Sequence, residues 1–340
     1  LILLVYSQPT VTQDFYHDLV SETQVTDPHD PIDLESRSKQ ELRDLLKFIY
    51  FSRVAHLSGV SEEAILEEFP GAIIRTTAKT NARFFLHKNQ PNKSIFMAIR
   101  GSHNLKNWLT NLEFWMRDND WFEHKIHSGF LRVSQEIYHL IEAELDPSYN
   151  IVLTGHSMGG AIAAIIGAYL HNQGFKVEVI TYAQPRVTDN SGASKMQIVD
   201  LKRVVIRGDI VNMLPPFNYA HFGKEIVLEV DRYFPEDYQA DFLDGKSPEI
   251  YVPLFRIEFG GKASPKRTGK KKPLEPGSRT FYNGYVEGGK IEAVHNLNAY
   301  FRAMRARISE ILGGVSEPLN SKLESLQFPE STSFPILPSR

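Results

Sequence analysis

The segment Gly155–Gly159, with the sequence GHSMG, has the residue types of a serine nucleophile held on a sharp turn. The apolar run 151–153 precedes it and the small residues of 160–170 follow it, an order that predicts strand, turn and helix. In that setting G-x-S-x-G forms a nucleophile elbow, because any larger side chain at either glycine would collide with the neighbouring strand or helix. A Gly/Ser turn also produces the bare pattern, so the flanking elements favour Ser157 as a nucleophile.

A serine hydroxyl needs a base to take its proton, and the base needs an acid to orient it. In elbow-type enzymes the acid and then the histidine follow the serine along the chain. Of the twelve histidines, only His171, His221 and His295 follow Ser157. His171 lies on the elbow helix itself, about four turns from its start, too far to reach back. His295, just ahead of the last predicted helix, is favoured as the base, and His221 is interpreted as a structural histidine.

Asp209 is the favoured acid. It follows the apolar run 204–206 and a short turn, which predicts a position at the carboxyl end of a strand. Open parallel sheets carry their catalytic groups at that edge. Asp189 and Asp200 are competitors, but neither directly follows a predicted strand.

The elements that must position these residues alternate between helix and strand. Apolar residues at helical spacing predict helices that begin near Lys39 and that span 131–145 and 296–312. Short apolar runs predict strands at 73–74, 84–85, 95–99, 151–153, 177–182 and 203–206. This order predicts an α/β fold with a largely parallel central sheet covered by helices on both faces.

Composition bounds the class of protein. The 340 residues are 42% hydrophobic and 23% charged, as in ordinary globular proteins. A net charge of −3 gives no basis for general nucleic-acid affinity. The absence of cysteine excludes disulfides, a thiol nucleophile and thiolate metal sites. No stretch approaches the roughly 20 apolar residues of a transmembrane helix.

Three segments lie outside the regular pattern. Residues 1–38 are predicted to form an extended arm. The apolar residues 1–5 at its start fit either the end of a signal peptide or a buried strand. A signal peptide would indicate a secreted or cell-envelope protein. A cytoplasmic location stays open. Within 231–292, a Gly/Pro-rich insertion, basic residues gather around 262–272, which favours a solvated loop over a contact with an anionic surface. Residues 313–340 are interpreted as a tail, which leaves 39–312 as one domain.

Several motifs together resemble the class 3 lipases of filamentous fungi, an α/β-hydrolase family that acts on acylglycerols. They occur in order over roughly residues 40–312: Ile99–Ser102 with Asn107 and Trp108, His127–Phe130, Thr154–Gly159, Gln184–Val187, Arg203–Val205 with Asp209 and Leu214–Pro216, His221–Glu225, and His295. The resemblance implies Ser157 as nucleophile, Asp209 as acid and His295 as base. These are the residues that chain order favours.

The resemblance also implies an oxyanion hole. Ser102 would contribute its backbone amide and hydroxyl, and Met158 its backbone amide. Two departures from the family stand out. The separation of 86 positions from Asp209 to His295 exceeds the usual spacing, and fungal members commonly contain disulfides, which this chain lacks. The second departure favours a bacterial or otherwise divergent member.

A lid is the third feature that the resemblance implies. All three tryptophans, Trp108, Trp115 and Trp121, follow the oxyanion serine closely. The residues at helical spacing that would form the apolar face of a lid helix are Leu105, Trp108, Leu109 and Leu112. Such a helix would cover the site and open at a lipid–water interface, so we expect a preference for aggregated long-chain esters.

The sequence predicts a triacylglycerol lipase or esterase that works through an acyl-enzyme and requires no metal or cofactor. Its activity should fall at acid pH as His295 becomes protonated. Phospholipase, galactolipase or feruloyl esterase activity on the same scaffold, and a serine peptidase, remain alternatives. A non-catalytic binding scaffold is disfavoured, because it would not need Ser157, Asp209, His295 and Ser102 together.

Overall fold

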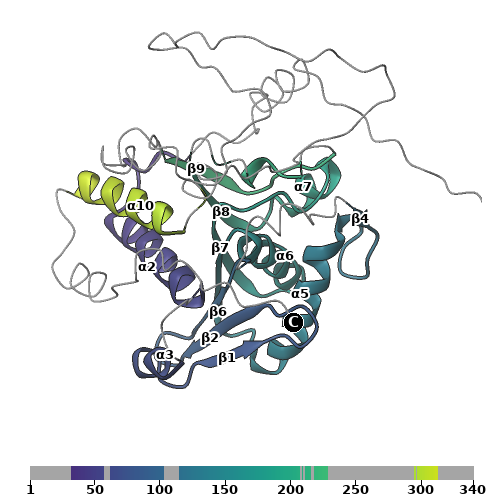
Figure 1. Cartoon of the computed structure of the whole chain (residues 1–340), viewed down its shortest axis with the longest axis horizontal. Helices are drawn as coiled ribbons and strands as arrows, with labels where there is room; N and C mark the ends of the chain where they lie inside the picture. Colours follow the sequence, from purple (N-terminus) through teal and green to yellow (C-terminus); the bar gives the residue numbers. More distant parts are fainter. Residues whose placement is uncertain are drawn as a thin grey trace, which may run out of the picture. The chain divides into compact units, whose positions relative to one another are not determined.

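A central sheet organises the part of the chain that the computed structural model describes, namely residues 32–56, 62–102, 115–206, 209, 211–215, 218–228, 295 and 297–312. Within these residues the sheet has seven strands in the order β1-β2-β3-β6-β7-β8-β9 (Figure 1). Their bounds are β1 Ile73–Thr76, β2 Arg83–Asn89, β3 Ser94–Ile99, β6 Asn150–His156, β7 Lys176–Tyr182, β8 Asp200–Ile206 and β9 Lys224–Leu228.

The sheet is mostly parallel. Strands β3, β6, β7, β8 and β9 pair in parallel, whereas β1, β2 and β3 pair antiparallel at one edge. The central strands β3 and β6 contain apolar runs, Ile95–Ile99 and Ile151–Leu153, because helices cover both of their faces. Strand β9, at the far edge, is not among the strands that the sequence predicts.

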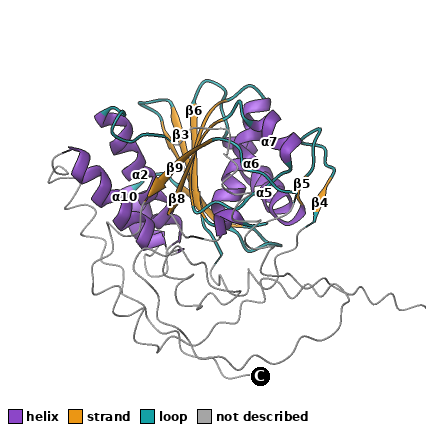
Figure 2. Cartoon of the chain, turned by 90° about the horizontal axis from the view of Figure 1, so that it is seen from above, coloured by secondary structure: helices purple, strands orange, loops and turns teal. Residues whose placement is uncertain are grey.

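Helices lie on both faces of the sheet, as predicted (Figure 2). One face carries α2 (Lys39–His56) and α10 (Leu297–Leu312), and the other carries α5 (Ser128–Ile141), α6 (Met158–Asn172) and α7 (Asn190–Met196). The short helices α3 (Glu62–Glu68), η1 (Glu142–Glu144) and η2 (Val211–Met213) and the ribbon of β4 (Met116–Arg117) and β5 (Ile126–His127) complete the elements. The fold is that of an α/β protein.

The predicted helix near Lys39 is confirmed as α2, and its start is explained by a capping box. The Ser38 backbone N–H donates to the Glu41 carboxylate at 2.9 Å, and the Glu41 N–H donates to the Ser38 hydroxyl at 3.2 Å. These two bonds satisfy donors that the first turn of a helix leaves unpaired. The predicted helix at 131–145 begins earlier, at Ser128, and gives way to η1 after Ile141.

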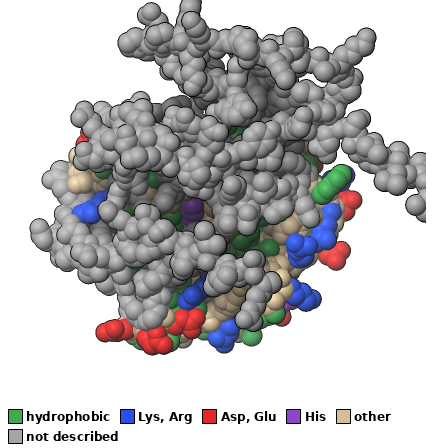
Figure 3. All heavy atoms as spheres, in the orientation of Figure 1, with side chains coloured by type: hydrophobic (Ala, Val, Ile, Leu, Met, Phe, Trp, Pro, Cys, Tyr) green, Lys and Arg blue, Asp and Glu red, His purple; other side chains and the backbone are tan. Residues whose placement is uncertain are grey.

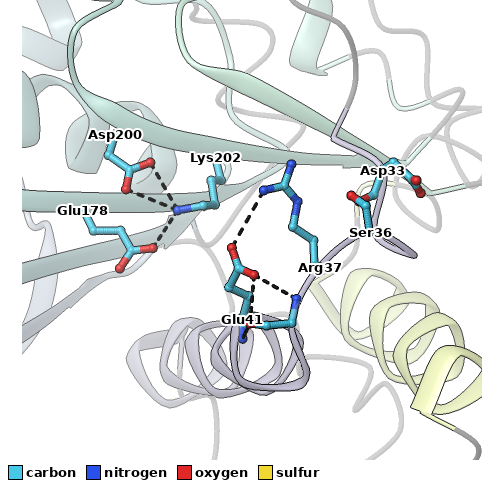
Figure 4. A network of polar contacts seen from close by, with 8 residues as sticks. Asp33, Ser36, Arg37, Glu41, Glu178, Asp200 and Lys202 are labelled. Carbon is cyan, nitrogen blue, oxygen red and sulfur yellow. Dashed lines mark hydrogen bonds and ion pairs between the residues drawn. The ribbon is translucent and has the colours of Figure 1, made fainter.

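An ionic network lies close to the start of α2 (Figure 4). Lys202 on β8 contacts Glu178 on β7 at 2.7 Å and Asp200 at 3.2 Å. Burial alone would lower the pKa of Lys202, but the two carboxylates outweigh it and the pKa is raised. Lys202 therefore stays charged and links the neighbouring strands β7 and β8. Asp200, a competing candidate for the catalytic acid, forms an ion pair in this network.

The described part of the predicted arm, residues 32–38, leads into α2. The Ile32 N–H donates to the Glu225 carbonyl at 2.7 Å, and the Leu34 side chain is buried. Residues 1–31 of the arm, the predicted insertion 231–292 and the tail 313–340 lie outside the described residues. On the face in Figure 3 the described surface carries both acidic and basic side chains. No helix in the described ranges has the length and apolar content that crossing a membrane requires.

Candidate active site

Ser157 lies on the turn between β6 and α6, as the elbow pattern predicts. Its backbone has φ 56° and ψ −128°, in the left-handed half of conformational space that non-glycine residues seldom adopt. Such strain persists only where the surrounding structure enforces it, and it is typical of functional sites. The side chain is nearly buried.

Two glycines allow the elbow to form. A Cβ atom at Gly155 would lie 2.4 Å from the backbone of Gly159, and one at Gly159 would lie 2.2 Å from the carbonyl oxygen of Ile99. Both distances are far below van der Waals contact, and the obstacles are backbone atoms that cannot turn aside. The two glycines therefore let α6 start against the ends of β3 and β6.

Asp209 and His295 meet in the interior. The Asp209 Oδ2 atom accepts a hydrogen bond of 2.9 Å from His295 Nδ1. Asp209 follows the end of β8, and its Oδ1 atom accepts the Val211 N–H at 2.9 Å. His295 stands just before α10, and both side chains are buried. Because β6 and β8 run parallel, Asp209 and Ser157 lie at the same edge of the sheet.

The bond to Asp209 assigns the tautomer of His295. Nδ1 must carry the hydrogen because a carboxylate only accepts. Nε2 of a neutral ring is then an acceptor, and among the described residues it has no hydrogen-bond partner. A histidine in this state can take a proton from a nearby hydroxyl.

Tyr300, on α10, is part of the site but carries no sequence signal for it. Its hydroxyl donates to Asp209 Oδ2 at 2.7 Å and accepts the Ile206 N–H at 3.0 Å. Burial and the neighbouring Asp209 carboxylate raise the pKa of Tyr300 well above its ordinary value, so the hydroxyl keeps its proton. Asp209 thus receives hydrogen bonds from His295, Tyr300 and the Val211 amide.

His156, which precedes the elbow serine, contacts His295 directly. Its Nε2 atom lies 2.7 Å from the His295 carbonyl oxygen, and since a carbonyl only accepts, Nε2–H is the donor. The centroids of the two rings are 4.7 Å apart. The variable position of G-x-S-x-G therefore holds the backbone of the candidate base, and this contact brings His295 next to the elbow.

Ser102 and Met158 also meet. Ser102 follows the end of β3, and its hydroxyl donates to the Met158 sulfur at 3.4 Å. Met158 is the first residue of α6, where backbone N–H groups are unpaired within the helix and the dipole is positive. This end of the helix can stabilise a negative charge.

The competing residues have other partners. The His221 Nε2 atom donates to the Asn212 carbonyl. Burial and then the charges of Arg203 and Arg186 hold the pKa of His221 well below its ordinary value. Asp189 caps α7 by accepting the Gly192 N–H at 2.7 Å.

The lid residues Leu105, Trp108, Leu109 and Leu112 lie outside the described residues. Of the other two tryptophans, Trp121 stacks on Tyr169 of α6 with ring centroids 3.9 Å apart. It therefore packs against the body of the fold. Trp115 is 74% exposed.

A mostly parallel sheet, helices on both faces and a serine on a strand–turn–helix elbow define the α/β-hydrolase fold. Residues 96–219 match the model of the class 3 lipase family. This match confirms the resemblance to class 3 lipases that the motifs of the sequence indicate.

Individual relatives agree with this family. The chain is 34% identical over 170 residues to the secreted mono- and diacylglycerol lipase 1 of Fusarium solani, which covers 47% of this chain and 50% of that protein. It is 33% identical over 162 residues to a lipase of Rhizomucor miehei, covering 43% of this chain and 44% of the relative. The chain thus spans about half the length of these curated relatives.

A solved lipase structure has a similar fold. The triacylglyceride lipase of Rhizomucor miehei superposes with a TM-score of 0.51 at 26% identity, covering 56% of this chain and 82% of that one. The predicted fold class is confirmed.

Proposed function

We propose that this protein is a serine hydrolase that cleaves carboxylic esters of lipids, a triacylglycerol lipase with Ser157 as nucleophile, His295 as base and Asp209 as acid. The observation that carries the proposal is the buried hydrogen bond of 2.9 Å between Asp209 and His295, beside the strained elbow of Ser157. A carboxylate that orients a histidine next to a serine on a sharp turn is the arrangement that activates a hydroxyl for acyl transfer.

The reaction would proceed in two halves. His295 Nε2 takes the proton of Ser157 as its oxygen attacks the ester carbonyl, and the imidazolium is stabilised by Asp209. His295 then gives the proton to the leaving alcohol, which completes the acyl-enzyme. Water, deprotonated by His295, attacks the acyl carbon and releases the fatty acid and the free serine. The chemistry of these residues requires no metal or cofactor.

The oxyanion that forms in each half needs preorganised donors. We propose the backbone amides of Ser102 and Met158 and the hydroxyl of Ser102 for this role. The position of Met158 at the start of α6 supports it, because the helix dipole adds to the amide there. One such donor is typically worth about 3–4 kcal/mol of transition-state stabilisation.

The proposed substrates are acylglycerols presented at a lipid–water interface. The names of the Fusarium mono- and diacylglycerol lipase and of the Rhizomucor triacylglyceride lipase support the substrate class. The exposed Trp115, directly after the proposed lid segment, supports an interfacial site, because indole side chains partition to such interfaces. The Fusarium relative is named a secreted protein, and we propose secretion here as well. In the native host the ester-hydrolase activity should then be found in the medium and not in the cells.

The test is hydrolysis of p-nitrophenyl esters and of triacylglycerol emulsions over a range of acyl lengths. Ser157→Ala should lower kcat by a factor of roughly 10⁴ or more, and a phosphonate inhibitor should label the unmodified protein at Ser157. Ester hydrolysis that survives in Ser157→Ala would refute the assignment. If the unmodified protein hydrolyses no ester, the result would favour a non-catalytic binding protein over an enzyme. Equal rates on monomeric and emulsified esters would refute the interfacial part.

A further inference from the structure

The contact between the Ser102 hydroxyl and the Met158 sulfur joins the proposed oxyanion serine to an oxidisable side chain. The oxygen–sulfur distance is 3.4 Å. Gly155, His156, Ser157 and Gly159 around Met158 are all buried, whereas Met158 itself is partly exposed. The thioether therefore lies at the proposed site, on a residue that is partly exposed to solvent.

We propose that Met158 is a modification site at which oxidation to the sulfoxide inhibits the enzyme. This inference rests on the proposed function, because it concerns the same oxyanion hole. A peroxide is the oxidant that the modification requires. The sulfur lone pair attacks one peroxide oxygen, the O–O bond breaks, and the sulfoxide and one molecule of water form from hydrogen peroxide. The sulfur is oxidised by two electrons and the peroxide is reduced by two.

The sulfoxide changes what the Ser102 hydroxyl encounters. A thioether sulfur is a weak acceptor, so the hydroxyl can leave it for an oxyanion when substrate binds. A sulfoxide oxygen is polar and accepts strongly, and it would be bonded to the sulfur that the Ser102 hydroxyl contacts in the thioether. The hydroxyl would then remain bound to the sulfoxide and would no longer stabilise the transition state.

Exposure separates the six methionines into three that are buried and three that are partly exposed. All six methionines of the chain lie in the described residues, and Met97, Met196 and Met304 are buried in the core. Met116 and Met213 are partly exposed, as Met158 is. They provide matched controls, since neither contacts Ser102 through a hydrogen bond in the described structure.

The experiment titrates the full chain with hydrogen peroxide and follows two readouts. Peptide mass spectrometry locates the added oxygen, and hydrolysis of a soluble p-nitrophenyl ester gives kcat. We expect kcat to fall about tenfold or more in step with Met158 sulfoxide, approaching the roughly 100-fold effect of losing an oxyanion donor. Methionine sulfoxide reductases, one for each epimer, should restore the activity.

Variants distinguish the effect of oxidising Met158 from the effect of oxidising Met116 and Met213. The activity of each variant after peroxide is compared with the activity of the same variant before treatment. Met158→Leu should keep its activity under peroxide, while the double variant Met116→Leu/Met213→Leu should be inhibited like the unmodified protein. Ser102→Ala should lose little of its residual activity on oxidation, because the hydroxyl that the sulfoxide captures is absent. Inhibition that persists in Met158→Leu, or complete Met158 sulfoxide without inhibition, would overturn the proposal.

Failure of the proposed function gives a different result. If the untreated protein hydrolyses no ester, the enzyme assignment fails and the inhibitory effect fails with it. The modification site is still judged by the peptides: Met158 should gain oxygen at least as fast as Met116 and Met213. Slower oxidation of Met158 than of either control would refute the site itself.

Discussion

The Tyr300 hydroxyl donates a hydrogen bond of 2.7 Å to the same Asp209 oxygen that accepts from His295. The hydroxyl also accepts the Ile206 N–H, so its own orientation is set by the end of β8. A buried carboxylate is costly unless it is hydrogen-bonded, and here three donors surround it. Tyr300 therefore belongs to the support of the proposed triad although it does not touch the reacting atoms.

Tyr300→Phe should reduce both stability and turnover. The substitution removes a bond to a charged group, typically worth about 1.5–3 kcal/mol, and leaves the Ile206 N–H without its acceptor. Part of this loss should appear as a kcat about 3- to 30-fold lower, because Asp209 would be held less firmly against His295. Urea unfolding and kcat on a p-nitrophenyl ester measure the two effects.

The matched control is Tyr182→Phe. The Tyr182 hydroxyl is equally buried and donates to the Leu45 carbonyl at 2.8 Å, away from Asp209. We expect this variant to lose stability while its kcat changes by less than about twofold. Equal kcat losses in the two variants would mean that Tyr300 acts only through stability.

His156→Phe should lower kcat with little change in KM. Phenylalanine keeps a ring beside His295 but cannot donate to its carbonyl, so the backbone that carries the proposed base loses an anchor. We expect a loss of about tenfold, equivalent to one hydrogen bond. His156→Gln, whose amide can reach the same acceptor, should recover part of the activity. No difference between the two variants would contradict the anchoring role.

Gly159→Ala should abolish the native elbow. Its Cβ would lie 2.2 Å from the Ile99 carbonyl oxygen, so β3 and α6 would have to separate. The control is Gly174→Ala, where an added Cβ atom would have no other atom within 4 Å. Its only obstacle is the backbone φ of +86°, which residues with a side chain seldom adopt. This control should lower the free energy of unfolding by about 1–2 kcal/mol and leave phosphonate labelling of Ser157 unchanged. Full labelling of Gly159→Ala would contradict the packing argument.

Acid should destabilise the fold through His221. Its pKa is depressed in the folded protein, so below about pH 6.5 the unfolded chain binds a proton that the folded chain does not. The free energy of unfolding therefore falls as pH decreases through this window, by at most about 1.4 kcal/mol per pH unit from this residue. As pH is lowered, the urea midpoint of His221→Gln should fall less steeply than that of the unmodified protein. Parallel plots of midpoint against pH for the two proteins would refute this contribution.

The sequence alone determined the alternation of helices and strands and the position of Ser157 between them. These features are local, because periodic apolar residues and the two elbow glycines specify them within a short stretch of chain. The sequence did not predict strand β9, since Lys224–Leu228 is short and lies at an edge of the sheet where three of its five residues are not fully buried. The order of serine, acid and histidine limited the candidates. The predicted positions of the strands and helices then favoured Asp209 as the acid and His295 as the base.

Only the tertiary structure decided which side chains surround that pair. Tyr300 is 91 residues from Asp209 in the chain, and His156 is 139 residues from His295. The Met158 sulfur likewise meets a hydroxyl 56 residues away. No local pattern encodes these contacts, because each depends on how parallel strands bring their ends to one edge and how α10 packs across it. Hydrogen bonds form over about 3 Å, and folding alone brings such distant residues within that range.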